Sequence, residues 1–187
     1  MQKMVIQLSK IRYIGNYIFK RVIQVIAEAE KRCHRCCFTG HRPEKLQRTE
    51  KEIWIDLESE IRNAIHDGLN VFITGMARGV DIDAAEIVLQ LREEGYPVRL
   101  ICASPYPGFD NNWSRAWQTR YGAVIAKADL VRYICPQYTK DCFQIRNEWM
   151  VNHSARVIAV FNGQPSGTKN TIDYALRQGV PVIRIKG

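Results

Sequence analysis

The chain has 187 residues, which is enough for one α/β domain with a sizeable core and too few for two. Hydrophobic residues make up 46% and charged residues 25% of the chain, proportions that exclude disordered, collagen-like and low-complexity proteins. The formal net charge is +8, but residues 1–32 hold seven Lys or Arg against two Glu, so most of the excess lies there and the charge is weak evidence for nucleic-acid binding.

The first predicted element is an N-terminal helical extension, residues 1–32. Between residues 4 and 29, apolar side chains recur at steps of three and four, which predicts an amphipathic helix. Charges interrupt the apolar stripe too often for it to span a bilayer. We favour a helix that packs on its own domain or on a second copy of the chain, as in a homo-oligomer. Peripheral contact with an anionic membrane surface through residues 4–29 is the alternative.

Six cysteines follow in a chain without a recognisable secretory signal, which favours a reducing cytoplasm over a disulfide framework. Cys33, Cys36 and Cys37, with His34 and His41 nearby, form only half of a zinc motif. A structural zinc ion needs four converging ligands. The sequence therefore predicts no metal site.

Residues 33–187 are expected to form one Rossmann-like nucleotide-binding domain. Short apolar runs at 35–39, 70–74, 97–103, 130–134, 156–161 and 180–185 alternate with helical patterns at 50–67, 81–94, 111–127, 143–153 and 168–178. Continuous apolar runs are typical of strands buried on both faces. The fold class is therefore α/β, with a doubly wound, mainly parallel sheet flanked by helices on both faces.

Ligands bind such sheets at the carboxyl ends of the strands, so the loops after strands are the candidate sites. The first is FTGHRPEKL, residues 38–46. Gly40 allows close backbone approach, and Arg42 is placed where a guanidinium could bind a phosphate or carboxylate in a bidentate manner. A surface arginine in a tight turn is the alternative reading of Arg42.

The second loop lies in FITGMARGVDIDAAE, residues 72–86. Gly75 and Gly79 bracket a short connection between strand and helix, which would turn backbone N–H groups of the loop, including those of Met76 and Ala77, toward an anion. Asp81 is expected to cap the helix that follows. The spacing matches neither a Walker A loop nor G-x-G-x-x-G, which disfavours an ATPase and an ordinary dinucleotide dehydrogenase.

Two further loops complete the predicted site. In ASPYPGFDNNWSRAW, residues 103–117, Trp113 could stack on a nucleobase or pack over the core. In FNGQPSGTKNTIDYA, residues 161–175, glycines and hydroxyls again lead into a helix N-terminus. A preceding helix offers Arg146 and Asn147. The ligand-binding residues predicted from these last segments are Gly163, Ser166, Gly167, Thr168, Arg146 and Asn147.

The blocks FTGHRP, TGMARGVD, RNEWMVNHSARVIAVFNG and SGTKNTIDYALRQGVPVIRI resemble the SLOG superfamily of Rossmann-like proteins, most closely its YpsA-type branch. They are also similar to the DNA-processing protein A (DprA) family. The resemblance covers about residues 35–187. It implies a nucleotide or nucleotide-derived ligand, such as ADP-ribose or an NAD-like molecule, and a sensor or regulator role in bacterial physiology, near cell division.

The resemblance leaves two alternatives open. The DprA relatives imply binding of single-stranded DNA, which requires a basic groove interleaved with aromatic residues. Related phosphoribohydrolases cleave nucleoside monophosphates, but Asn170 and Thr171 stand where those enzymes carry glutamates. Because glycosidic cleavage needs a carboxylate, the departure favours binding over catalysis, and no catalytic residue is predicted.

Overall fold

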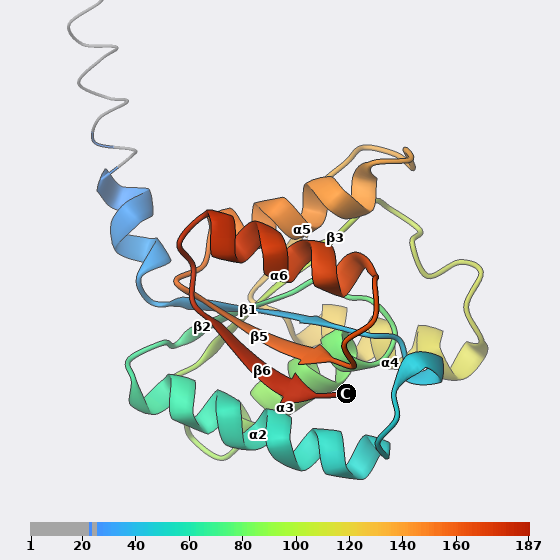
Figure 1. Cartoon of the computed structure of the whole chain (residues 1–187), viewed down its shortest axis with the longest axis horizontal. Coiled ribbons are helices and arrows are strands. Elements are labelled where there is room, and N and C mark those ends of the chain that lie inside the picture. Colours follow the sequence, from blue (N-terminus) through green and yellow to red (C-terminus); the bar gives the residue numbers. More distant parts are fainter. Residues whose placement is uncertain (1–22, 24–25) are drawn as a thin grey trace, which may run out of the picture. The chain divides into compact units, whose positions relative to one another are not determined.

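A computed structural model describes residue 23 and residues 26–187 (Figure 1). The chain divides into two compact units, Met1–Cys33 and His34–Gly187. In the first unit residues 26–32 are helical, in agreement with the end of the predicted N-terminal helix; the rest of that prediction, apart from residue 23, lies outside the described residues. Within the described ranges, no helix combines the length and the apolar character needed to cross a membrane.

The second unit is built on one parallel sheet of six strands. They are β1 (Arg35–Gly40), β2 (Val71–Thr74), β3 (Arg99–Ser104), β4 (Leu130–Tyr133), β5 (Arg156–Phe161) and β6 (Val182–Lys186). Their order is β4-β3-β2-β1-β5-β6, with every neighbouring pair parallel. The chain therefore winds outward from β1 to β4 and returns to start again at β5. This reversal opens a crevice at the carboxyl ends of β1 and β5.

Helices cover both faces of the sheet, which confirms the predicted α/β doubly wound fold. On one face lie α2 (Glu50–His66), α3 (Val80–Glu93) and α4 (Arg115–Lys127), and on the other α5 (Cys142–Asn152) and α6 (Gly167–Arg177) (Figure 1). A short 3-10 turn, η1 (Pro43–Lys45), follows β1. The largest deviation from the predicted elements is at α4, which begins at Arg115 rather than near residue 111 because an irregular loop occupies 105–114.

Two hydrophobic clusters form the core, one on each face of the sheet. Phe38 and Phe72 belong to the cluster under α2, α3 and α4, whereas their strand neighbours Cys37 and Ile73 belong to the cluster under α5 and α6. Successive side chains of a strand point to opposite faces, so a strand buried on both faces must be apolar at every position. The Cys36–Cys37 pair is accordingly core, wholly buried in β1.

Candidate functional site

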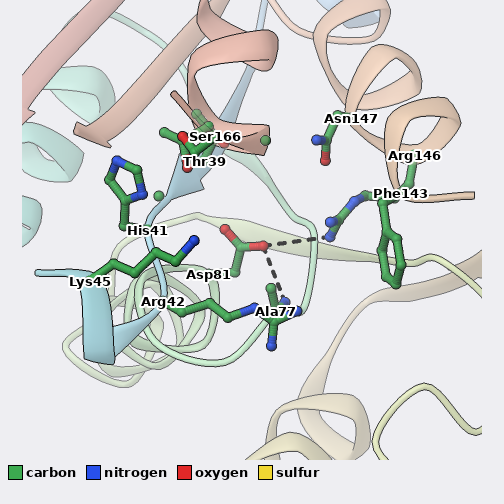
Figure 2. A pocket seen from close by; sticks show the side chains of 13 residues that line it. Thr39, His41, Arg42, Lys45, Ala77, Asp81, Phe143, Arg146, Asn147 and Ser166 are labelled. Atoms are coloured by element: carbon green, nitrogen blue, oxygen red, sulfur yellow. Dashed lines mark hydrogen bonds and ion pairs between the residues drawn. The ribbon is translucent and has the colours of Figure 1, made fainter. Parts of the chain in front are cut away.

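A pocket of about 250 Å³ lies at the carboxyl ends of β1 and β5, where the strand order reverses (Figure 2). Its walls come from β1 and the turn after it, the β2–α3 connection, the first two turns of α5 and the start of α6. The residues that line it are Thr39, Gly40, His41, Arg42, Lys45, Ala77, Asp81, Phe143, Arg146, Asn147, Ser166, Gly167 and Thr168. Segments more than 100 residues apart in the chain thus meet at one site.

The β2–α3 connection is a tight turn whose geometry depends on Gly79. Its φ of 83° lies in the left-handed region that favours glycine. Gly79 is the N-cap of α3, and its carbonyl accepts from Asp83 N at 3.0 Å. The expectation that Asp81 caps the helix is therefore wrong. The helix begins at Val80, so Asp81 already lies within its first turn and not at the capping position. Its carboxylate lines the pocket instead.

Two amides of this turn, those of Met76 and Ala77, bond to neighbouring side chains, contrary to the sequence-based expectation. The Met76 N–H donates to Thr74 Oγ1 at 3.2 Å, and the Ala77 N–H donates to Asp81 Oδ2 at 3.1 Å. The Met76 side chain is fully buried in the core. Short polar side chains next to a turn compete for its backbone donors. The Met76 and Ala77 N–H groups are therefore used within the turn, and the turn contributes the Asp81 carboxylate to the site.

Arg146, from α5, crosses the crevice toward this turn. Its side chain is buried, Nη1 donates to the Gly75 carbonyl, and Nη1 lies 3.6 Å from Asp81 Oδ2. A Cβ on Gly75 would overlap the Arg146 guanidinium and approach Asp81 Oδ2 to 2.8 Å. Gly75 therefore does not line the pocket but leaves the room that Arg146 occupies.

The Arg146 guanidinium has donors to spare. Within the described residues, Nε is buried without a hydrogen-bond partner, and Nη2 makes no hydrogen bond. A buried donor that stays unsatisfied costs about 1–3 kcal/mol, and more when it is charged. Gly75 and Asp81 thus hold the Arg146 side chain in place, and its remaining N–H groups can donate to a further acceptor.

The charges of the pocket are unbalanced. Burial raises the pKa of Asp81 above its ordinary value, an effect that Arg146, the Ala77 N–H and Arg42 oppose. Burial likewise lowers the pKa of Arg146, although a guanidinium starts so high that it stays protonated at neutral pH. Two guanidinium groups thus act on one carboxylate, and Lys45 adds a third positive charge to the wall.

The start of α6 adds a second anion-binding feature. The Ser166 side chain caps the helix by accepting from Lys169 N at 3.2 Å. The N–H groups of Gly167 and Thr168 belong to the first helical turn, where no intrahelical acceptor is available, and both residues line the pocket. The partial positive charge of a helix N-terminus favours an anion there.

The apolar wall of the pocket is Phe143 and not Trp113. The Phe143 ring belongs to a cluster with Tyr106, Phe109 and Tyr138, with ring centroids 5.6–6.3 Å apart. Trp113 packs edge-on against Phe109 and Tyr121, and it is not among the lining residues. Trp113 therefore packs over the core, as one of the two sequence-based alternatives had it, because the loop before α4 folds back on the core.

Nine of the predicted residues come together in the pocket, and five do not. Gly40, Arg42, Ala77, Asp81, Arg146, Asn147, Ser166, Gly167 and Thr168 line it, whereas Gly75, Met76, Gly79, Trp113 and Gly163 do not. Gly163 lies exposed in the β5–α6 loop.

Sequence reasoning missed Thr39, His41, Lys45 and Phe143 as lining residues. Thr39, His41 and Lys45 lie within the candidate loop 38–46, so the sequence does indicate the segment that holds them. His41 is buried with its ring stacked on Phe161, and burial lowers the pKa of its imidazole. Phe143 carries no signal until α5 is placed.

Comparison with protein families identifies the relatives of this chain. A sequence profile of the YpsA family, described as the YspA SLOG family, matches residues 36–179. A UPF0398 protein of Shouchella clausii is 32% identical over 115 residues, which cover 60% of this chain and 61% of that protein. The SPbeta prophage-derived protein YoqJ of Bacillus subtilis is 32% identical over 116 residues, or 56% of this chain and 68% of that protein.

Two solved structures share the fold. DNA processing protein A (DprA) from Streptococcus pneumoniae superposes with a TM-score of 0.62 at 23% identity, over 83% of this chain and 51% of that one. DprA from Helicobacter pylori, whose single-stranded DNA binding mode is known, superposes with a TM-score of 0.59 at 21% identity. The match covers 86% of this chain and 68% of that one. This chain therefore spans about half of the pneumococcal structure and less than two thirds of the Shouchella relative. At these identities the two structures establish the fold alone.

Proposed function

The chain belongs to the YspA SLOG family, and from that premise we propose that it binds a phosphate-bearing nucleotide or nucleotide derivative in the pocket at the β1–β5 crevice. Binding, rather than turnover, is the activity, and the role is that of a sensor or regulator. The ligand's phosphate is held by Arg42, Arg146 and the N-terminus of α6.

The observation that carries this proposal is the state of Arg146. A buried guanidinium with Nε unpartnered among the described residues is costly without a ligand and favourable with one. The planar donor pattern of arginine matches the oxygens of a phosphate in a bidentate manner. The pocket thus presents unused guanidinium donors to an anionic acceptor.

The size and lining of the pocket limit the ligand. A volume of about 250 Å³ is just below the roughly 300–1,000 Å³ of pockets that enclose drug-sized ligands. One nucleotide half therefore fits within the walls. An ADP-ribose or NAD-like ligand would place one half inside and the other over the rim, and Phe143 offers an aromatic face for a base.

The pocket lining gives little support to a phosphoribohydrolase. Asp81 is the one carboxylate among the lining residues, and its Oδ2 is already engaged by the Ala77 N–H and by Arg146. Cleavage of a glycosidic bond uses a carboxylate that is free to stabilise the oxocarbenium ion or to activate water.

Single-stranded DNA is the second candidate ligand, favoured by the likeness in fold to the Helicobacter pylori protein. Such binding requires a basic groove along which successive bases stack on aromatic side chains. Tyr138, which is exposed beside Phe143, could begin such a platform. The pocket itself is better matched to one terminal phosphate than to a continuous strand.

Calorimetric titration tests the proposal with AMP, ADP-ribose and NAD as probes. Arg42→Gln removes a pocket cation, and Arg99→Gln is the matched control because Arg99 lies exposed at the opposite, amino end of β3. We expect saturable 1:1 binding of at least one probe, weakened about tenfold by Arg42→Gln and unchanged by Arg99→Gln. Equal affinities for all three proteins, or no binding, contradict the proposal.

A further inference from the structure

Asp81 has one carboxylate oxygen that the protein does not use. Oδ2 accepts from the Ala77 N–H at 3.1 Å and faces Arg146 at 3.6 Å. Oδ1 accepts no hydrogen bond within the described residues, although the residue is only 5% exposed and lines the pocket. In Figure 2 this second oxygen points away from Arg146, into the space beside Lys45 and His41.

Oδ1 faces the pocket as a free acceptor, and an ionised phosphate supplies no donor for it. Asp81 is thus the one group of the pocket lining that repels the phosphate for which the cations are suited. The carboxylate is held in place by the Ala77 N–H and by Arg146. A ligand that satisfies the whole pocket must therefore carry hydrogen-bond donors beside its anionic group.

The position of Asp81 indicates which part of a nucleotide brings the donor. In Figure 2 the carboxylate lies between Lys45 and His41 on one side and Phe143 and Arg146 on the other. In a nucleotide the sugar is bonded directly to the phosphate. A phosphate held by Arg146 therefore brings the sugar hydroxyls beside Asp81, whose Oδ2 lies 3.6 Å from that guanidinium.

We propose that Asp81 Oδ1 accepts hydrogen bonds from the sugar hydroxyls of the ligand, so that the pocket selects ribonucleotides over deoxyribonucleotides. This inference rests on the proposed function. It also separates the two candidate ligands. Within a DNA strand the 2′-hydroxyl is absent and the 3′-oxygen is esterified, so a strand laid in the pocket offers Oδ1 no sugar hydroxyl.

Asp81→Asn tests the role of this oxygen because the local hydrogen bonds fix the orientation of the new amide. The Ala77 N–H and the Arg146 guanidinium are both donors, so they hold the amide oxygen where Oδ2 lies. The NH₂ group then faces the pocket, where the wild type presents an acceptor. The matched control is Asp83→Asn, the same change on the same helix, because Asp83 is buried against Arg120 of α4 and does not line the pocket.

The experiment is calorimetric titration with AMP, 2′-deoxy-AMP and 3′-deoxy-AMP, which keeps base and phosphate constant. We expect the wild type and Asp83→Asn to bind AMP about tenfold or more tightly than at least one deoxy analogue. In Asp81→Asn the three affinities should agree within about twofold, since the acceptor is gone. A thermal melt of each variant verifies that it is folded.

The outcomes are distinguishable. If the wild type binds AMP and both deoxy analogues equally well, the inference is overturned and the proposed function stands. The same follows if Asp81→Asn keeps the full preference for AMP over the deoxy analogues. Wild-type protein that binds none of the three probes, nor ADP-ribose or NAD, overturns the proposed function and the inference with it. If Asp81→Asn fails to fold, the wild-type comparison of AMP with its analogues still decides.

Discussion

At the scale of single residues, Gly75 determines whether the site can form. Arg146 fills the space where a Cβ of residue 75 would lie, and Asp81 Oδ2 is 2.8 Å from the same point. The glycine was recognisable in the sequence, but its role was not. Sequence reasoning assigned it to phosphate binding through the backbone, whereas the structure uses it to admit a side chain from α5.

Gly75→Ala should therefore displace the Arg146 guanidinium. We expect about a tenfold loss of affinity for a nucleotide probe and a loss of about 1–3 kcal/mol in the free energy of unfolding, the usual cost of overpacking. Calorimetry and urea denaturation measure the two effects. Gly122→Ala, in α4 with open space around the added methyl group, is the control and should leave affinity unchanged. Wild-type affinity in Gly75→Ala would contradict this role of Arg146.

Asp83 is a second residue whose surroundings predict a measurable property. Its carboxylate pairs with Arg120 at 2.7 Å, beside Glu86, which pairs with the same guanidinium. Burial raises the pKa of Asp83 to about 6 from an ordinary value of 3.8, against the opposing effect of Arg120. Between these two values the folded protein binds a proton that the unfolded chain does not. Stability that Asp83 contributes is therefore present below about pH 4 and is lost as the pH rises to about 6.

Asp83→Asn should remove this dependence. From pH 4 to pH 7 the free energy of unfolding of the wild type should fall relative to that of the variant by about 2 kcal/mol, because the pKa of Asp83 rises from 3.8 to about 6 on folding. Urea denaturation of both proteins across this range gives the difference. Parallel pH profiles would mean that the pKa of Asp83 is not raised in the folded protein.

At the scale of elements, two helices, α2 and α6, begin with side-chain caps, one outside the pocket lining and one within it. Thr49 caps α2 in a reciprocal pair with Glu52, in which the Thr49 N–H donates to Glu52 Oε2 at 2.9 Å. Ser166 caps α6 at the pocket wall. Both caps satisfy donors that a helix start leaves free, but only one of them lies at the site.

Replacing each cap with alanine should separate stability from binding. Thr49→Ala and Ser166→Ala should each lower the free energy of unfolding by about 1 kcal/mol. Only Ser166→Ala should also weaken nucleotide binding, several-fold, because it disturbs the N-terminus of α6. Denaturation and calorimetry on the two variants provide the comparison. Equal loss of affinity in both would show that binding follows global stability.

The elements themselves were largely predictable from local pattern. Apolar runs such as 156–161 depend on neighbours in the chain, and the strands appear where these patterns place them. The route of the β2–α3 turn was not predictable. Whether the amides of Met76 and Ala77 face a ligand or the side chains of Thr74 and Asp81 depends on contacts that spacing does not encode.

At the scale of the whole molecule, the pocket depends on strand order. The positions of β1 and β5 in the chain do not reveal that these strands are neighbours. They pair from Cys36 opposite Arg156 to Gly40 opposite Val160, which brings the loops after them together. The rule that ligands bind at the carboxyl ends of parallel strands selected the correct edge of the sheet. Which loops share one cavity, and that Phe143 rather than Trp113 faces it, required the packed structure.

The distribution of charge separates specific from nonspecific ligands at this scale. The basic excess lies mostly in residues 1–32, so binding of a single-stranded oligonucleotide should weaken steeply with salt and be unaffected by Arg42→Gln. AMP binding, which buries one phosphate, should depend less on salt and should be weakened by Arg42→Gln. Fluorescence anisotropy and calorimetry from about 50 to 300 mM salt compare them. An oligonucleotide that competes with AMP and loses affinity in Arg42→Gln would favour the DNA alternative.

The most direct measurement locates the ligand on the protein. Titration of ¹⁵N-labelled protein with AMP, followed by amide chemical shifts, reports which backbone groups meet the ligand. We expect the largest shifts at Gly167 and Thr168, which line the pocket in the first turn of α6, and smaller shifts at Ala77 and around Arg146. Saturating shifts confined to another surface, such as the groove lined by Glu86 and Lys127 between α3 and α4, would contradict it.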